Sequence, residues 1–323
     1  LENTDVSLYR RNMNQFQRHD NVKKEIFWKS PGKGVAILAS SYYVTLNKTE
    51  LMAFGTKMTR SDTADVAYLR HSPDNGRTWI DSGELKTCEK MPLGMRRTHP
   101  RGGYVDPSTG RYVTFWTEGI LPSDDPLEGL KNWTLWYSVS EDGGRTKKIC
   151  QPIIHEGENF DEKHPIPGVI VGKSCFMIGD LGQRPLTRSD GVIMMPIQAS
   201  HVDERGEYCN PGNGYTYTDC LLLMGRWRSD GSLRWRTSHR IIGDPKRSTR
   251  GMIEPTITEI ENRRLLMVMR GSNDKRPELP GWRWYSISED GGETWTVPEP
   301  WKYSNGESFY SPSSCSQLLP WKD

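Results

Sequence analysis

A short motif repeats along the chain at wide intervals, and this repeat constrains the possible fold more than any other feature. Three copies share the pattern S-x-D-x-G-x-T, and a degenerate copy lies between the second and the third. They are SPDNGRTW at Ser72–Trp79, SEDGGRTK at Ser140–Lys147, RSDGSLRW at Arg228–Trp235 and SEDGGETW at Ser288–Trp295. A period of roughly 60–90 residues suits one four-stranded blade with loops of variable length. We therefore expect an all-β fold, a six-bladed β-propeller of four-stranded antiparallel blades. The whole of 1–323 would form one domain, with an incomplete C-terminal blade.

The residue types of the motif predict a structural turn and no catalysis. An aspartate in the third position can accept hydrogen bonds from backbone N–H groups of its own turn, and a following glycine allows the positive φ of a tight turn. A terminal Trp, as in Trp79, would bury apolar surface against the neighbouring strand. We therefore expect the motif aspartates to lie in equivalent outer turns of three blades, far from any functional pocket. These aspartates are Asp74, Asp142 and Asp290.

Segments rich in aromatic and β-branched residues, with rough alternation, lead into the three full copies and predict strands. They are Asp65–Arg70, Trp133–Val139 and Trp282–Ile287. Further predicted strands are Glu50–Gly55, Arg111–Trp116, Val192–Ile197, Leu221–Trp227 and Leu265–Arg270.

Charge and composition exclude several classes of function. The chain has 43 Lys and Arg against 41 Asp and Glu, spread along its length, so we expect no nucleic-acid partner. No apolar stretch approaches the ~18 residues of a membrane span. Six scattered cysteines without a CxxC pair predict no metal, and no motif predicts a cofactor. The chain opens on Leu1, so we expect a secreted or periplasmic protein whose signal peptide has been removed. The oligomeric state stays open.

Beyond the repeats, several segments together resemble the sialidase (neuraminidase) superfamily of BNR, or Asp-box, repeat β-propellers. The most specific is GMIEPTITEIENRRLLMVMR at Gly251–Arg270, which is similar to the strand pair carrying a catalytic Glu and a substrate-binding Arg. The other segments are Thr49–Trp79, His99–Trp116, Ser189–Pro196 and Ser311–Leu319. The resemblance covers nearly the whole chain and implies a sialidase-like fold that acts on glycans.

The resemblance also implies roles for individual residues. Asp62 falls at the position of the acid/base aspartate, with Asp65 as its nearest competitor. Glu254 would take the proton from a tyrosine nucleophile, which is weak at its ordinary pKa of ~10. Arg270 would hold a substrate carboxylate through a two-pronged contact that lysine cannot match.

Two departures from the family pattern bear on the substrate. Sialidases carry their first carboxylate-binding arginine in a YRIP motif, where this chain has Ala39 or Ser40. The third arginine and the tyrosine nucleophile are expected beyond Asp323. Other arginines could replace the missing one, and Arg97 and Arg250 are the best placed of them. The remaining candidates are Arg60, Arg96, Arg101 and Arg184, while His99, His164 and His201 would serve a histidine-based site.

The leading hypothesis is an exo-acting glycoside hydrolase that removes a terminal acidic or deoxy sugar, sialic acid included, from a glycan. Two alternatives stay open: a polysaccharide lyase acting on uronates, and a non-catalytic glycan-binding propeller. Because one charge-assisted contact is worth about 1.5–3 kcal/mol, the missing arginine predicts poor cleavage of ordinary sialosides.

Overall fold

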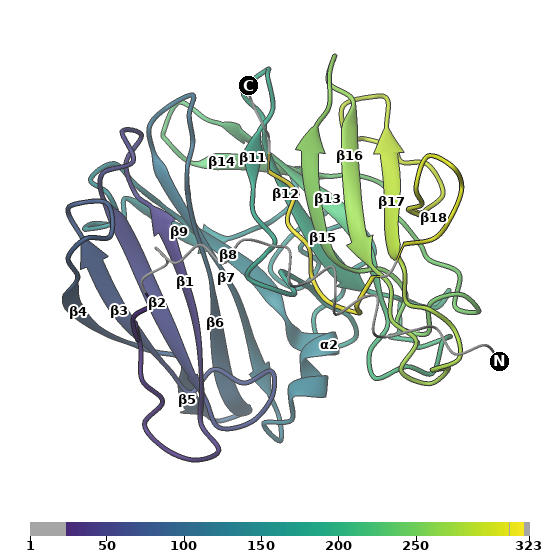
Figure 1. The fold of residues 1–323 in the computed structure, drawn as a ribbon, viewed down its shortest axis with the longest axis horizontal. Coiled ribbons are helices and arrows are strands. Elements are labelled where there is room, and N and C mark those ends of the chain that lie inside the picture. Colours follow the sequence, from purple (N-terminus) through teal and green to yellow (C-terminus); the bar gives the residue numbers. More distant parts are fainter. Residues whose placement is uncertain (1–23, 310, 320–323) are drawn as a thin grey trace, which may run out of the picture.

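The computed structural model describes residues 24–309 and 311–319, and these form four antiparallel sheets arranged around a common centre (Figure 1). Blade 1 consists of β1 (Ala36–Tyr43), β2 (Leu51–Met58), β3 (Val66–Ser72) and β4 (Ile80–Lys86). Blade 2 consists of β5 (Cys88–Met91), β6 (Gly94–Val105), β7 (Tyr112–Leu121), β8 (Thr134–Ser140) and β9 (Ile149–Pro152). Two helical turns, η1 (Pro126–Glu128) and α2 (Gly129–Asn132), connect β7 to β8.

Blade 3 has an interrupted inner strand, since β10 and β11 both pair with β12. Its strands are β10 (Phe176–Met177), β11 (Leu186–Thr187), β12 (Ile193–Ser200), β13 (Thr218–Trp227) and β14 (Leu233–Thr237). Blade 4 consists of β15 (Ile253–Glu259), β16 (Leu265–Arg270), β17 (Arg283–Ser288) and β18 (Glu299–Pro300). No helix in the described part of the chain is long and apolar enough to cross a membrane.

The all-β propeller fold is confirmed, but the expected count of six blades is wrong, because the described residues form four. The number of motif copies matches this count, because each of the four copies lies in one blade. The copies start 68, 88 and 60 residues apart, so one blade with its connections takes up 60 residues or more. Long connections, such as residues 153–175 between blades 2 and 3, use up chain that further strands would need. After β18, Lys302 and Ser308 pair in an isolated bridge, and residues 311–319 contain no strand.

Each blade is an antiparallel meander, so its turns alternate between two ends of the molecule. The connection between the last two strands carries a motif copy in every blade, at β3–β4, β8–β9, β13–β14 and β17–β18. We call this side the Asp-box end. The connections that precede these last two strands, at β2–β3, β7–β8, β12–β13 and β16–β17, and those that link successive blades, lie at the opposite side, which we call the cleft end.

The motif aspartates close their own turns, as expected. In the first copy the Ser72 hydroxyl donates to Asp74 Oδ1 (2.9 Å) and accepts the Gly76 N–H (2.8 Å). Asp74 also accepts the Thr78 N–H (2.8 Å) and hydroxyl (2.7 Å). The second and third full copies repeat these contacts. The prediction of equivalent outer turns in three blades is therefore confirmed.

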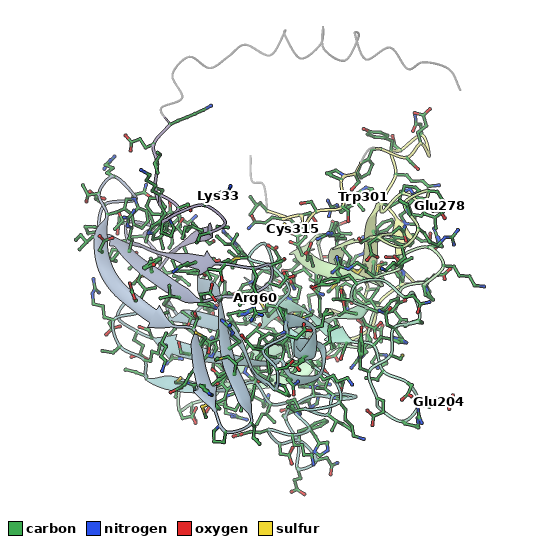
Figure 2. All side chains as sticks on the ribbon, turned by 90° about the horizontal axis from the view of Figure 1, so that it is seen from below. Lys33, Arg60, Glu204, Glu278, Trp301 and Cys315 are labelled. Atoms are coloured by element: carbon green, nitrogen blue, oxygen red, sulfur yellow. The ribbon has the colours of Figure 1, made fainter. Side chains whose placement is uncertain are left out.

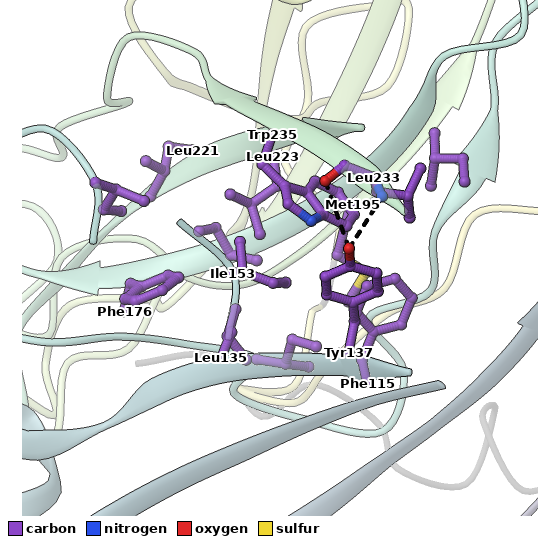
Figure 3. Packing of buried hydrophobic residues seen from close by; sticks show 14 of the residues in the cluster. Phe115, Leu135, Tyr137, Ile153, Phe176, Met195, Leu221, Leu223, Leu233 and Trp235 are labelled. Carbon is purple, nitrogen blue, oxygen red and sulfur yellow. Dashed lines mark hydrogen bonds between the residues drawn. The ribbon is translucent and has the colours of Figure 1, made fainter. Parts of the chain in front are cut away.

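The hydrophobic core lies between blades, and blade 3 is its centre. One cluster joins blades 2 and 3 through Phe115, Tyr137 and Trp235 (Figure 3). The Tyr137 hydroxyl, at the middle of this cluster, accepts the Leu233 N–H (2.9 Å) and lies 3.4 Å from the Leu233 carbonyl oxygen. A second cluster joins blades 3 and 4. Every residue of β12 is buried, so this blade fixes the positions of both neighbours.

A buried carboxylate adds a polar link between blades 2 and 3. Asp106, fully buried in the β6–β7 turn, accepts the Thr187 hydroxyl (2.7 Å) and the Trp227 indole N–H (2.8 Å), both from blade 3. Burial alone would raise the pKa of Asp106, but hydrogen bonds from Ser108, Thr187 and others outweigh it and lower the pKa. The carboxylate is therefore a satisfied structural group.

Candidate active site

Two adjoining clefts at the cleft end share Asp62, His99, Arg101 and Gly179 in their walls. The larger cleft, of about 120 Å³, also contains Gln198, Tyr215, Thr216, Arg250 and Glu254. The smaller, of about 90 Å³, extends to Leu38 of β1 and to Asp180. The three motif aspartates line neither cleft. Wider grooves of about 580 and 740 Å³ lie beside blade 2, but Asp62, Glu254 and Arg250, three of the residues singled out from the sequence, line the smaller pair of clefts.

Glu254 reaches the cleft because of a β-bulge at the start of β15. Ile253 pairs with Arg270 and Thr256 pairs with Val268, so β15 has one residue more than its partner strand between these pairs. Pro255 has no N–H to give to the ladder, and Glu254 takes a positive φ of 51°. Bulges of this kind redirect a side chain. The Glu254 N–H donates to Gln198 Oε1 (2.8 Å), so blade 3 holds the bulge in place.

Glu254 and Arg270, sixteen residues apart in the sequence, form an ion pair on neighbouring strands. Arg270 Nη1 donates to Glu254 Oε1 (2.8 Å) and Oε2 (3.0 Å), and Arg270 Nε donates to the Ser313 hydroxyl (3.1 Å). Both side chains are largely buried. Asp274, an acidic residue four positions after Arg270, does not pair with it and instead accepts the Tyr215 N–H (2.8 Å) and the Thr249 hydroxyl (3.0 Å).

Residues 311–319 pack against blade 4 next to the Glu254–Arg270 pair. The Leu318 N–H donates to Thr256 Oγ1 of β15 (3.0 Å), and Arg283 Nη1 donates to the Ser314 carbonyl (2.5 Å). In Figure 2 the labelled Cys315 lies between blade 1 and blade 4, toward the middle of the molecule. The segment Ser311–Leu319, which resembles the sialidase strand before the third arginine, therefore lies beside the residues of the site.

The structure separates the two aspartates that compete for the acid/base position. Asp65 accepts the N–H (2.9 Å) and hydroxyl (2.8 Å) of Thr59 and pairs with Arg97 (3.3 Å), so it closes the β2–β3 loop. Asp62 is exposed, has a φ of 56° and lines both clefts, and within the described chain its carboxylate accepts a side-chain hydrogen bond only from the Ser61 hydroxyl (3.1 Å). Asp62 is thus open to a ligand, whereas Asp65 is committed to the fold.

Arg97, one of the two arginines preferred from the sequence, lines neither cleft. Its Nε and Nη2 donate to Asp124 Oδ1 (2.7 Å) and Oδ2 (2.8 Å), and its Nη1 donates to the Ala64 carbonyl (2.9 Å). The hydrogen bonds that Arg97 donates to Asp124 are the main reason that the pKa of Arg97 is raised. Asp124 lies in the β7–β8 connection, so only the folded chain brings this partner to Arg97.

Arg250, the other preferred arginine, does line the larger cleft. Its Nε and Nη2 both donate to the Thr216 hydroxyl (3.1 and 2.8 Å), and its guanidinium carbon lies 5.7 Å from the Tyr215 ring centre. It forms no ion pair with a carboxylate of the described chain. Burial, followed by the charge of Arg270, lowers its pKa.

Arg101, one of the remaining candidates, lines both clefts. It lies in a second β-bulge, since the β6–β7 register shifts between Pro100 and Gly103. Gly102 has a φ of 97° and packs against Tyr42 so closely that a Cβ would lie 2.0 Å from the ring. A proline followed two residues later by Gly102 and Gly103 is a pattern typical of a bulge in a strand, and this signal could have been used.

Arg101 and His99 present polar atoms that the described protein does not satisfy. Arg101 Nη2 lies 3.4 Å from His99 Nδ1, while Arg101 Nε and His99 Nε2 are buried without a hydrogen-bond partner. Arg101 forms no ion pair with a carboxylate of the described chain, and burial lowers its pKa. Burial also lowers the pKa of His99 to about 3, and its ring packs 4.9 Å from that of Trp133.

The position of the missing first arginine lies on β1. Ala39 pairs with Gly55 and Ser40 with Phe54, and neither can supply a charge. The nearby Tyr42 packs under Gly102, and its hydroxyl donates to the Arg101 carbonyl (3.5 Å). Arg184 lies over the Tyr42 ring, with its guanidinium carbon 5.1 Å from the ring centre.

Comparison with known proteins agrees with this architecture. Residues 155–314 match the BNR repeat-like domain family. Similar solved structures include a Hadza microbial sialidase, Hz136, with 17% identity and a TM-score of 0.51 over 82% of this chain and 46% of that one. A mutant of the NanB sialidase from Streptococcus pneumoniae has 12% identity and a TM-score of 0.51 over 86% of this chain and 54% of that one.

A third similar structure is the GH93 α-L-arabinofuranosidase of Fusarium graminearum with arabinobiose, at 14% identity and a TM-score of 0.50, over 86% of this chain and 71% of that one. The chain thus spans about half the length of the two sialidases. No curated protein matches it in sequence. At these identities the comparisons support the fold and leave the substrate open.

Proposed function

Since the chain is a sialidase-like β-propeller with BNR repeats, we propose that it is an exo-acting glycoside hydrolase that removes a terminal acidic sugar from a glycan. The observation that carries the proposal is that Glu254, which is paired with Arg270, lines a cleft that also contains Asp62. The charges of Glu254 and Asp62 both act on Arg101 and on Arg250, which supports a common site for all four.

In the proposed reaction Asp62 gives its proton to the glycosidic oxygen as the bond to the anomeric carbon breaks. Glu254 accepts the phenolic proton of a tyrosine as that tyrosine forms a bond to the anomeric carbon. Water then attacks the anomeric carbon of the glycosyl intermediate while Asp62 takes the water's proton. The bond between the tyrosine oxygen and the sugar breaks in this step, and Glu254 returns its proton to the departing phenolate. Tyr215 is the tyrosine that lines the larger cleft together with Glu254 in the described chain, and Tyr215→Phe tests whether it is the nucleophile.

Cations in the cleft favour an acidic sugar over a neutral one. Arg101 and Arg250 lack a carboxylate partner in the described chain, and a buried guanidinium without one is costly. A substrate carboxylate would supply that partner. The absence of an arginine at Ala39 and Ser40 argues that the sugar is held differently from the sialic acid of a sialidase.

The test is an assay on fluorogenic glycosides of sialic acid, glucuronic acid and galacturonic acid, each compared with the fluorogenic glycoside of a neutral sugar. We expect release of an acidic sugar, and a kcat/KM on the sialoside below the ~10⁴ M⁻¹s⁻¹ of ordinary enzymes. Reaction in ¹⁸O-labelled water should place the label in the released sugar. A product that absorbs near-ultraviolet light as an unsaturated uronate would instead identify a lyase, and binding without product would identify a glycan-binding propeller.

A secreted or periplasmic location is part of this proposal, because terminal sugars of glycans are found outside the cytoplasm. Fractionation of the producing cells would test it. Recovery of the protein in the cytoplasmic fraction alone would contradict the proposed location.

A further inference from the structure

Two buried hydrogen-bond donors belong to cleft-lining residues of one bulged strand and lack partners in the described protein. Arg101 Nε and His99 Nε2 are both buried and make no hydrogen bond in the described protein. His99 is more than nine-tenths buried, and both residues belong to the walls of both clefts. Buried polar atoms in native proteins are nearly always satisfied, so an unsatisfied pair in a cleft wall calls for a partner that the described residues do not supply.

The hydrogen-bond chemistry determines what His99 can offer. A guanidinium can only donate, so His99 Nδ1 accepts from Arg101 Nη2 (3.4 Å). Burial, with the charges of Arg101 and Arg97, keeps the imidazole neutral near pH 7. A neutral imidazole carries one proton, which therefore lies on Nε2. Both unsatisfied atoms are consequently N–H donors.

The described part of the chain provides no internal acceptor for this pair. Asp180, Asp62 and Glu254 are the carboxylates whose negative charge acts on Arg101, but none of them forms an ion pair with it. Glu254 is held by Arg270, and the Asp180 carboxylate accepts the Gly182 N–H (3.0 Å). The local backbone also depends on a glycine. Gly102 lies in the bulge with a φ of 97° and packs against Tyr42, where a side chain would not fit.

We propose that the His99–Arg101 pair is an anion subsite that binds the carboxylate of the terminal sugar, with Arg101 Nε and His99 Nε2 each donating to a carboxylate oxygen. The inference rests on the proposed function and names the anchor for the acidic group of its substrate. This subsite lies on β6 of blade 2, whereas the absent sialidase arginine would lie on β1 of blade 1. The acidic sugar would therefore be held from a different side of the cleft.

The test measures binding, so that it does not depend on turnover. Isothermal titration of the full chain with free N-acetylneuraminic, glucuronic and galacturonic acids is compared with titration of the methyl ester or amide of each. We expect at least one acid to bind and its neutral derivative to bind roughly ten- to a hundredfold more weakly. Arg101→Met should weaken binding of that acid by a similar factor and leave binding of the neutral derivative unchanged.

Two His99 variants separate the donor from the shape of the ring. His99→Gln can keep an N–H near the position of Nε2 and should retain most of the affinity, whereas His99→Met removes the donor and should lose it. Arg184→Met is the matched control, since it removes an exposed arginine near Tyr42 that lines neither cleft. It should bind the acid as the wild type does. Melting temperatures confirm that every variant is folded, and Arg101→Met should melt no lower than the wild type.

A readout that needs no variant is the side-chain ¹⁵N spectrum of His99. We expect a neutral ring with its proton on Nε2 from pH 5 to 8, and a change at Nε2–H when the acid is added. Equal affinity for acid and neutral derivative, unchanged binding by Arg101→Met, or a proton on Nδ1 would each overturn the subsite. Arg101-dependent binding without any hydrolysis would uphold the subsite and refute the proposed function.

Discussion

The two ends of the propeller treat their polar side chains in opposite ways. At the Asp-box end each motif aspartate accepts several hydrogen bonds from its own turn, and the neighbouring Glu289 forms a two-pronged ion pair with Arg264 (2.7 and 2.9 Å). At the cleft end Arg101 Nε and His99 Nε2 have no partner in the described chain. The fully hydrogen-bonded groups at the Asp-box end stabilise the fold. The unpartnered donors at the cleft end lower its stability and are available to a ligand. The same substitution should therefore have different consequences at the two ends.

The largest expected difference concerns two glutamates that are each paired with an arginine. Glu254→Gln should lower kcat by roughly 10²–10⁴-fold on whichever acidic glycoside the wild type cleaves in the assay, because an amide cannot act as the base. Binding should change little. Glu289→Gln is the matched control at the Asp-box end and should leave kcat unchanged. Equal kcat for Glu254→Gln and wild type would show that Glu254 is not the base.

Two arginines of β6, four residues apart, offer the second comparison. Arg97 is fully paired with Asp124, Asp65 and a backbone carbonyl. Arg97→Met breaks these contacts and should lower the free energy of unfolding by about 2–4 kcal/mol, a loss that is reduced because the carboxylate partners are partly exposed. Arg101→Met removes a buried charge that has no such partner, and should not lower it. Urea denaturation of both variants measures the difference. A larger loss for Arg101→Met than for Arg97→Met would mean that Arg101 is a structural residue.

The buried neutral His99 predicts how stability depends on pH. The pKa of His99 is about 3 in the folded chain and about 6.5 when unfolded, so between these values the unfolded state binds more protons. The contribution of His99 is therefore complete above pH 6.5 and is lost progressively as the pH falls toward 3. By pH 5 the loss is about 2 kcal/mol. Urea denaturation at pH 7 and pH 5 should show a smaller difference for His99→Gln than for wild type, and an equal difference would contradict the assignment.

The smallest expected effect comes from one buried hydroxyl at the Asp-box end. The Ser288 hydroxyl accepts the buried Gly292 N–H (2.7 Å), so Ser288→Ala leaves that donor unsatisfied. We expect a loss of about 1–2 kcal/mol in the free energy of unfolding, with kcat and substrate affinity unchanged. Denaturation and kinetics of the same preparation test both parts. A change in kcat would show that the two ends of the propeller are coupled.

The sequence by itself determined the features that depend on residues close together in the chain. The motif at Ser72–Trp79 and its later copies specified turns, because each aspartate finds its hydrogen-bond donors within four residues. The strands that lead into these turns followed from their alternation, and the pairing of Glu254 with Arg270 followed from a single hairpin around residues 260–264. The blade count could not be predicted in this way, since it depends on how much chain the connections between blades consume.

Only the tertiary structure decided which arginines are available to a ligand. Arg97 and Arg101 look alike in the sequence, but Asp124 arrives from the next connection to occupy Arg97, and no described carboxylate reaches Arg101. Asp62 and Asp65 were likewise distinguished by the arrival of Arg97 and by the local bonds from Thr59. Charge and hydrogen-bonding capacity are properties of a residue, whereas whether they are already satisfied depends on neighbours that lie far away in the chain and are brought together by folding.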